Sequence, residues 1–202
     1  MAEAKIYLRP LQEEDSKVSF RWRNNPEVWK NTGSAPNCFI TEEMELAWIK
    51  KVLSDSSTKR YAICLEANDQ YIGNAYLSNI ANGRAEEQIF IGEPALWNQG
   101  IGTQARALLY KIAADELQLS IVVSNIRTRN IASLKSVLKL GFHEVARDSE
   151  WITLEKNLVS IEPCGGGVIL HCWNDFLAIL FSYSFPNTTR QVSCFDGCFC
   201  VG

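Results

Sequence analysis

The segment Trp97-Asn98-Gln99-Gly100-Ile101-Gly102-Thr103-Gln104-Ala105 is the strongest indication of fold in this 202-residue sequence. Its Gly-x-Gly turn leads directly into a helical pattern, in which apolar residues recur every three or four positions over residues 105–117. Glycines let the backbone approach an anion closely, and the first N–H groups of a helix lack intrahelical partners and lie at the positive end of the helix dipole. The segment therefore predicts a loop that binds phosphate groups.

The flanking residues argue against a nicotinamide-binding loop. An alternating apolar strand, residues 89–92, precedes the turn, so the local order is strand, loop, helix. A dinucleotide site has a third glycine three residues after the second, where Ala105 stands here, and an acidic residue about twenty positions further on. Consecutive hairpin strands come before this loop instead, and a second phosphate-compatible segment, residues 126–133, follows it.

Four parts of the sequence, in this order and spacing, resemble the GNAT family of acetyl-CoA-dependent acetyltransferases. They are Ala85-Glu86 at the start of a strand that runs to residue 93, the Gly100-Ile101-Gly102-Thr103 loop, Ile126-x-x-x-Asn130-x-x-Ser133, and Gly141-Phe142. The resemblance covers residues 5–158. It implies an α/β (α+β) GNAT fold, with a mixed, mostly antiparallel sheet of six to seven strands and helices on both faces.

The N-terminal half is similar to one branch of that family. Leu8-Arg9-Pro10 and residues 22–28 look like the enzymes that acetylate ribosomal-protein N-termini, polyamines and amino-sugar nucleotides. The resemblance therefore implies an acyltransferase whose acceptor is a small-molecule amine or a peptide N-terminus.

Local patterns predict where the elements lie. Asn82-Gly83 is a strong hairpin signal, Thr41 before Glu42 and Glu43 is typical of a helix N-cap, and Asn24-Asn25-Pro26 is expected to end a helix. The expected strands are residues 5–11, 61–67, 71–80, 85–92, 121–127, 142–147 and 151–157. The expected helices are residues 13–23, the helix capped by Thr41, the phosphate-loop helix up to about residue 117, and residues 131–140.

Composition fits one enzyme-sized domain, residues 1–158. A chain of 22.7 kDa in which 47% of the residues are hydrophobic can fill a single core. A net charge of −3 and an isoelectric point near 5.5 argue against a general nucleic-acid-binding protein, which normally has a basic face. Residues 1–30 lack a signal-peptide core, so we expect a cytoplasmic protein.

The cofactor site follows from the loop and the resemblance together, with acetyl-CoA as co-substrate. Backbone N–H groups of Gln99, Gly100, Ile101, Gly102 and Thr103 are expected to hold the pyrophosphate, with the Thr103 hydroxyl as a further donor. Main-chain groups of Phe90 and Ile91 are expected to pair with the pantetheine amides as an added strand would. The resemblance adds Asn130 and Ser133 to this site.

The catalytic prediction rests on what amide formation requires. Acetyl transfer from a thioester to an amine needs a neutral amine, a polarised carbonyl and a proton for the departing thiolate. Glu86 and Glu87 begin the strand expected beside the thioester, and because side chains alternate across a strand, only one of them can face it. The resemblance favours Glu86. The alternative is that both are solvated acids at a strand edge.

Two positions depart from the family pattern. The family commonly has Arg or Gln where Trp97 stands, and the lost charge should weaken pyrophosphate binding modestly. It often protonates the thiolate with a Tyr where Val137 stands, so Ser133 becomes a catalytic candidate. The alternative is a helix-start serine that bonds its own backbone, with Asn130 as a plain N-cap. Tyr110 is expected to be a packing residue.

The acceptor site is expected in the variable parts of the chain, namely residues 22–33 and the strand pair near the C-terminal end of the domain. Trp22, Arg23, Asn24 and Trp29 offer aromatic surface and hydrogen-bond donors, which suit a sugar, a nucleotide base or a peptide end. Core packing is the competing interpretation of the tryptophans. The segment looks most like enzymes that acetylate an amino-sugar nucleotide. A protein N-terminus, a polyamine, and a catalytically silent acyl-CoA-binding or interaction domain stay open as alternatives.

Residues 159–202 differ abruptly in composition, with only four charged residues, no lysine and five of the 7 cysteines. Cys194-x-x-x-Cys198-x-Cys200 lacks the spacing of zinc knuckles, so we expect no metal. The apolar residues 168–185 fall short of the roughly 20 needed for a membrane span. We expect no nucleic-acid or membrane partner. The tail is interpreted as an extension that packs on the domain or on the partner of a homodimer, a membrane-proximal segment, or sequence of non-native origin.

Overall fold

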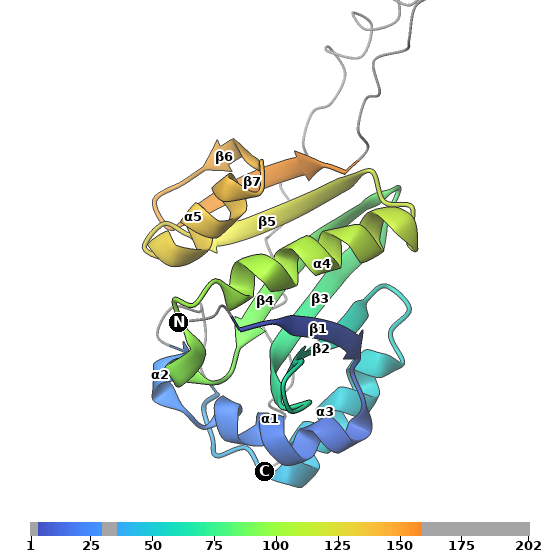
Figure 1. Ribbon diagram of the computed structural model, residues 1–202, viewed down its shortest axis with the longest axis vertical. Coiled ribbons are helices and arrows are strands. Elements are labelled where there is room, and N and C mark those ends of the chain that lie inside the picture. Colours follow the sequence, from blue (N-terminus) through green and yellow to red (C-terminus); the bar gives the residue numbers. More distant parts are fainter. Residues whose placement is uncertain (1–3, 30–35, 159–202) are drawn as a thin grey trace, which may run out of the picture. The chain divides into compact units, whose positions relative to one another are not determined.

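The computed structural model describes residues 4–29 and 36–158, and in this part seven strands form one sheet in the order β1-β2-β3-β4-β5-β7-β6 (Figure 1). The strands are β1 Ile6–Pro10, β2 Lys59–Leu65, β3 Tyr71–Ala81, β4 Arg84–Ile91, β5 Ile121–Arg127, β6 His143–Arg147 and β7 Trp151–Asn157. The helices are η1 Glu13–Asp15, α1 Ser16–Arg23, α2 Pro26–Trp29, α3 Glu42–Leu53, η2 Pro94–Leu96, α4 Ile101–Asp115 and α5 Ile131–Lys139.

The sheet is antiparallel except where β4 pairs with β5. This arrangement confirms the predicted fold class, and the strand count lies within the predicted range. None of the helices in the described residues is long and apolar enough to cross a membrane. The predicted tail, residues 159–202, and residues 30–33 of the predicted acceptor segment lie outside the described residues. The domain boundary at residue 158 therefore stays a prediction.

The two parallel strands separate soon after they begin. β4 and β5 pair only at Arg84 with Ile121, Ala85 with Val122, and Glu86 with Val123. β4 then continues for five residues to Ile91 without any further pairing to β5. The edge of β4 that faces β5 is therefore open beyond Glu86, and its main-chain groups there are not satisfied by the sheet.

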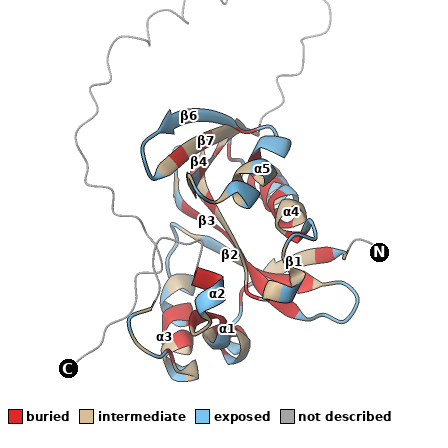
Figure 2. Cartoon of the chain, turned by 90° about the vertical axis from the view of Figure 1, so that its left-hand side faces the viewer, coloured by how far each residue is buried: buried red, intermediate tan, exposed pale blue. Residues whose placement is uncertain are grey.

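Helices cover both faces of the sheet, with α4 and α5 on one side and α1 to α3 on the other (Figure 2). On the first side, Leu109 and Ala113 of α4 pack into one apolar cluster with Leu77, Val122 and Leu154 of the sheet. All five side chains are fully buried. Burial of apolar surface is the main contribution to folding, at about 25 cal/mol per Å². The packing of these side chains fixes α4 rigidly over β4 and β5.

Local sequence signals explain most element boundaries. The Thr41 hydroxyl accepts a hydrogen bond from Met44 N at 3.3 Å, which confirms the predicted N-cap of α3. Asn82 and Gly83 both have positive φ, 50° and 71°, as the two-residue hairpin between β3 and β4 requires. The helix predicted over residues 13–23 is instead divided into η1 and α1. Pro26 ends one helix, as expected, and also begins α2, because proline suits the first position of a helix.

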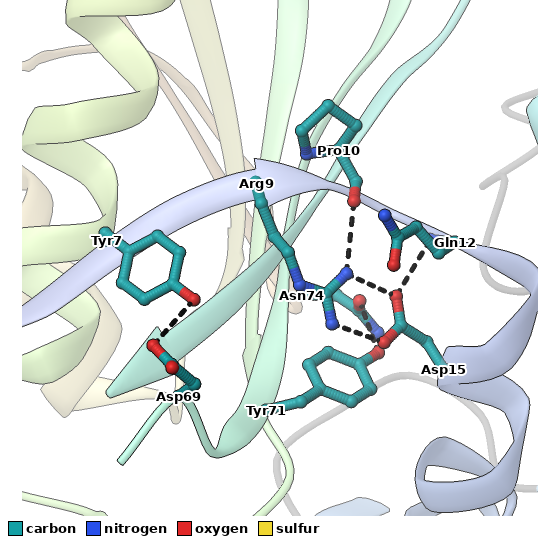
Figure 3. Close-up of polar contacts among 8 residues, drawn as sticks. All are labelled: Tyr7, Arg9, Pro10, Gln12, Asp15, Asp69, Tyr71 and Asn74. Carbon is teal, nitrogen blue, oxygen red and sulfur yellow. Dashed lines mark hydrogen bonds and ion pairs between the residues drawn. The ribbon is translucent and has the colours of Figure 1, made fainter. Parts of the chain in front are cut away.

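A partly buried ion pair joins β1 to this helix layer (Figure 3). Arg9 contacts the Asp15 carboxylate through Nη2 at 2.6 Å and Nη1 at 2.9 Å, and Gln12 N donates to the same carboxylate at 2.8 Å. These hydrogen bonds raise the pKa of the Arg9 guanidinium, which therefore stays charged. The guanidinium also lies over the ring of Tyr71, whose hydroxyl donates to Asn74 at 2.7 Å. The start of α1 is thus held against β1 and β3.

Gly92, directly after β4, lies against the Trp22 ring of α1. A Cβ atom at this position would come within 2.0 Å of Trp22 Cδ2. Real Cβ atoms do not approach other atoms so closely, so the ring occupies space that any other residue at position 92 would need. The helix layer can approach this end of β4 only because residue 92 has no side chain.

We therefore expect Gly92→Ala to displace the Trp22 ring and to lower the free energy of unfolding by about 1–3 kcal/mol. Urea denaturation measures the loss, and tryptophan fluorescence reports the changed ring environment. Gly102→Ala is the matched control, because a Cβ there would approach no atom closer than 4.0 Å. Equal stability of the two variants would contradict this account.

Candidate functional site

The phosphate loop has the backbone geometry that an anion site requires. Gly100 has φ 81° and caps α4, which begins at Ile101. Thr103 N and Gln104 N both donate to Gly100 O, at 2.9 and 3.0 Å. The N–H groups of Gly100, Ile101 and Gly102 have no acceptor within the described residues. Three successive donors at the positive end of a 15-residue helix are thus left for a ligand.

Trp97 connects this loop to the end of β4. Its indole Nε1 donates to Ile91 O at 2.9 Å, while the side chain of Gln99 donates to Ala95 O at 2.8 Å. The sequence indicates for Trp97 only that it stands where the family commonly has Arg or Gln. Its position gives it a structural role as well, because the bond fixes the loop relative to the strand that leads into it.

The register of the sheet decides which main-chain groups of β4 face its open edge. Gly92 N donates to Ile72 O of β3 at 2.8 Å, and residues of paired antiparallel strands alternate in this respect. Phe90, two residues earlier, therefore also directs its main-chain groups at β3. Ile89 and Ile91 direct theirs away from β3. The register thus directs the main-chain groups of Ile89 and Ile91, and not those of Phe90, at the open edge of β4. The predicted pairing of Phe90 and Ile91 with pantetheine stays a prediction.

A second helix begins beside the first. The Asn130 side chain accepts a hydrogen bond from Ser133 N at 3.2 Å and so caps α5. The Ser133 hydroxyl accepts a hydrogen bond from Arg106 of α4 at 2.8 Å, and Thr103 Oγ1 lies 2.9 Å from Ser136 Oγ. These contacts join the first turns of α4 and α5. The proposed contacts of Asn130, Ser133 and Thr103 with acetyl-CoA stay predictions.

The two candidate glutamates lie on opposite faces of β4, as side-chain alternation requires. Glu87 is only 3% exposed and accepts hydrogen bonds from Ser124 at 2.5 Å and Arg106 at 3.2 Å, on the side covered by α4. Glu86 is half-buried on the other side, where Asn125 Nδ2 donates to it at 3.4 Å. Glu86 also marks the last residue of β4 that pairs with β5.

Asn125 is in turn held by its neighbour across the sheet. The Thr153 hydroxyl of β7 donates to Asn125 Oδ1 at 2.8 Å, which directs the amide nitrogen at Glu86. No sequence signal pointed to this row of three side chains, since they come from strands that are far apart in the chain. Register alone brings them together.

Tyr110 and Val137 are embedded in the core. Tyr110 is 5% exposed and its ring packs on Phe142, with centroids 5.4 Å apart, which agrees with the expected packing role. Burial, and secondly the charge of nearby Glu87, raise the pKa of the Tyr110 phenol well above its usual value. The phenol therefore stays protonated at neutral pH. Val137, at the position of the usual acid, is fully buried.

The residues predicted to bind the acceptor make extensive internal contacts. Trp22 Nε1 donates to Glu93 at 2.9 Å, Trp29 Nε1 donates to Arg23 O at 2.8 Å, and both rings lie about 6 Å from the Phe90 ring. Asn24 bonds the main chain of Phe20 and Ile40. Arg23 is 5% exposed and lies between the rings of Trp29 and Trp48. The role of these residues in acceptor binding stays a prediction. Trp22 and Trp29 could fulfil it indirectly, because their rings position the Phe90 side chain.

A polar row that the sequence did not reveal crosses the same face. The Arg60 guanidinium of β2 lies 4.2 Å from the Tyr76 ring centroid and 5.2 Å from that of Trp48. The Tyr76 hydroxyl donates to Gln88 Oε1 of β4. Gln88 is two residues from Glu86 and therefore on its face. Polar and aromatic side chains therefore lie between the helix layer and the face of the sheet that carries Glu86.

Comparison with known proteins decides the family. Residues 5–143 match the family described as "Acetyltransferase (GNAT) domain". The chain belongs to the GNAT acetyltransferase family. It is therefore an acyltransferase of the N-acetyltransferase type, and its fold is the one that uses acetyl-CoA in this family.

The relatives support the same conclusion. The chain is 25% identical over 151 residues to the uncharacterized N-acetyltransferase p20 of Bacillus licheniformis, covering 72% of this chain and 84% of that protein. It is 26% identical over 157 residues to the uncharacterized protein MJ1062 of Methanocaldococcus jannaschii, covering 74% of this chain but only 31% of that protein. Spermidine N-acetyltransferase from Vibrio cholerae, solved with CoA and spermine, has the same fold, with TM-score 0.67, 18% identity and coverage of 76% and 95%.

The bond from Trp97 to Ile91 O can be tested by Trp97→Phe, which removes the donor and keeps most of the ring. One lost hydrogen bond should cost about 1 kcal/mol, and the loosened GNAT phosphate loop should bind CoA about five-fold more weakly by isothermal titration calorimetry. Trp151→Phe on β7 is the control and should leave CoA affinity unchanged. CoA binding by Trp97→Phe as tight as by the unaltered chain would show that the bond does not position the loop.

Proposed function

We propose that this chain transfers the acetyl group of acetyl-CoA directly to a primary amine at the point where β4 and β5 separate. One observation carries the proposal. Glu86 is the last residue of β4 that pairs with β5, and the same strand leads to a helix start at which three N–H groups have no acceptor among the described residues. A carboxylate and an anion site are thus held at the two ends of one open strand edge.

Acetyl-CoA supplies the acetyl group as a thioester, and the residues present suit its polar parts. The N–H groups of residues 100–102 would hold the pyrophosphate, with the Thr103 hydroxyl nearby. Ile89 and Ile91 direct main-chain groups at the open edge, where the pantetheine amides would pair as an added strand. Trp97 already bonds Ile91 O, which leaves Ile91 N and the Ile89 groups for such pairing. Asn130 and Ser133, at the start of α5, complete the proposed site.

Glu86 is the proposed general base. An amine attacks only when it is neutral, so a carboxylate must take its proton directly or through a water. Glu86 is accessible enough to meet an incoming amine, and Asn125 and Thr153 orient its carboxylate. Glu87, in contrast, is buried with Arg106 and Ser124 and has no route to an acceptor on the other face. Much of the rate would come from holding amine and thioester together.

We infer an amino-sugar nucleotide as the acceptor. On the described strands β4, β5 and β7, the acids on this face are Glu86 and Glu155, and Glu155 is paired with Arg84. Arg127 of β5, which is ion-paired with Glu150, lies over the Trp151 ring, 4.2 Å from its centroid. A planar cation on an aromatic surface suits a nucleotide phosphate or base, whereas a polycation would need several unpaired carboxylates.

A protein N-terminus and a polyamine are the competing acceptors. The Vibrio cholerae enzyme, solved with spermine, shares the fold, so a polyamine is tested as an acceptor as well. Release of free CoA from acetyl-CoA, measured with an amino-sugar nucleotide, peptides with free N-termini and spermidine, distinguishes them. The highest kcat/KM is expected for the amino-sugar nucleotide. Turnover on spermidine alone would overturn the acceptor assignment, and turnover on none despite CoA binding would overturn the catalytic proposal.

Glu86→Gln removes the proposed base with little change in shape. We expect kcat to fall about 10²-fold or more, with CoA affinity unchanged, and the rise of kcat/KM with pH that reports a base to disappear. Glu144→Gln on the exposed strand β6 is the control, because it removes a carboxylate far from the proposed chemistry. A pH–rate profile of Glu86→Gln that matches the unaltered enzyme would remove Glu86 from this role.

A further inference from the structure

One buried arginine connects the two helix starts of the proposed CoA site. Arg106 of α4 is 6% exposed. Its Nη2 donates to Ser133 Oγ at 2.8 Å, its Nη1 donates to Ser136 Oγ at 2.9 Å, and its Nε donates to Glu87 Oε1 at 3.2 Å. Every nitrogen of the guanidinium thus has a partner on β4 or α5.

The cost of burying this charge suggests a role beyond stability. Glu87 balances the charge of Arg106 and also accepts a hydrogen bond from Ser124. Its second oxygen, Oε2, is buried without a hydrogen bond in the part of the chain that the structure describes. Buried ion pairs can often be replaced by apolar residues without loss of stability, because desolvation offsets the attraction. An incompletely satisfied pair is therefore a weak means of stabilising the fold.

The chemistry of the guanidinium fixes the direction of the hydrogen bonds. It has five N–H donors and no acceptor, so both serine oxygens must be acceptors toward Arg106. The hydroxyl hydrogens of Ser133 and Ser136 then have to point elsewhere. Ser136 Oγ lies 2.9 Å from Thr103 Oγ1. When Ser136 donates its hydrogen to Thr103, the hydrogen of Thr103 is released for a group outside the network.

In the arrangement in which Ser136 donates to Thr103, both free hydrogens lie at the helix starts proposed for acyl-CoA. Thr103 follows the N–H groups of residues 100–102, which have no acceptor in the described part of the chain, and Ser133 lies in the first turn of α5. Neither residue is fully buried. A nearby positive charge also strengthens donation by a hydroxyl that accepts from it, because successive hydrogen bonds polarise one another.

We propose that Arg106 is a positioning residue that turns Ser133 and Thr103 into hydrogen-bond donors toward bound acyl-CoA. It acts directly on Ser133 and through Ser136 on Thr103, and Glu87 keeps its charge balanced in the core. The natural targets are the pyrophosphate oxygens for Thr103 and the pantetheine oxygens or sulfur for Ser133. This inference rests on the proposed function, because it requires that acyl-CoA binds at these helix starts.

Removing Arg106 alone would leave Glu87 charged and unpaired in the core, so the pair is replaced together. Glu87→Met with Arg106→Met keeps the volume and removes both charges. We expect a folded protein with an unchanged urea midpoint or a higher one. Its Kd for CoA, by isothermal titration calorimetry, should rise 10- to 100-fold, as the loss of charge-assisted donors implies. Turnover should show the loss mainly as a higher KM for acetyl-CoA.

A double-mutant cycle separates positioning from packing. Thr103→Ala and Ser133→Ala should each weaken CoA binding about ten-fold in the unaltered chain, but less than two-fold in the double-methionine background, where their hydrogens are no longer directed. Ser136→Ala keeps the Arg106–Glu87 pair intact and should still weaken CoA binding several-fold. It tests the relay even if the double variant does not fold.

The outcomes are distinct. Native CoA affinity in the double variant, equal penalties in both backgrounds, or native affinity of Ser136→Ala would each overturn the role of Arg106 while the proposed function stands. Failure of the unaltered chain to bind CoA would overturn the proposed function, and this inference with it.

Discussion

The early end of the pairing between β4 and β5 is the constraint on which the rest of the site depends. Three residue pairs join these strands, and beyond Glu86 and Val123 the two strands no longer pair with each other. An unpaired strand edge inside a sheet is costly unless something else satisfies its main-chain groups. The Trp97 indole satisfies one carbonyl, and the remaining groups are those with which we propose that pantetheine pairs as an added strand.

Two buried ion pairs lie on the two sides of the sheet. Arg106 of α4 pairs with Glu87 of β4, and Arg23 of α1 pairs with Glu45 of α3, with Nε and Oε2 3.5 Å apart. Burial raises the pKa of Glu45, while Arg23 and Ser19 oppose the shift. Each pair joins elements that are separate in sequence. The gap therefore lies between two layers that each bury an ion pair and pack through apolar side chains.

Features set by neighbouring residues could be predicted from the sequence. The cap at Thr41, the turn at Asn82-Gly83 and the loop before α4 depend on local backbone preferences, and each of these elements lies where its pattern placed it. The opposite facing of Glu86 and Glu87 follows from alternation along one strand. The family assignment depended on the spacing of several such local motifs.

Features set by register or by distant partners could not be predicted. The main-chain groups of Phe90 and Ile89 face opposite edges of β4. The sequence predicts that this direction alternates along the strand, but not which residue faces which edge. Arg106 looks like one charged residue on an amphipathic helix until Glu87 and Ser133 are placed beside it. A contact between residues that are far apart in the chain produces no periodic pattern in the sequence.

The contact between Trp22 and the end of β4 has a consequence for how such an enzyme can diverge. The Trp22 ring fills the place of a side chain at residue 92, and its indole nitrogen bonds the next residue, Glu93. In the proposed function, the α1 segment contributes to the acceptor site, and the strand below it contributes to the cofactor site. Because the Trp22 ring of α1 also fills the space beside residue 92, the effect of a substitution at position 92 depends on the residue at position 22. Only a lineage that first reduces residue 22 in size gains the freedom to lose the glycine.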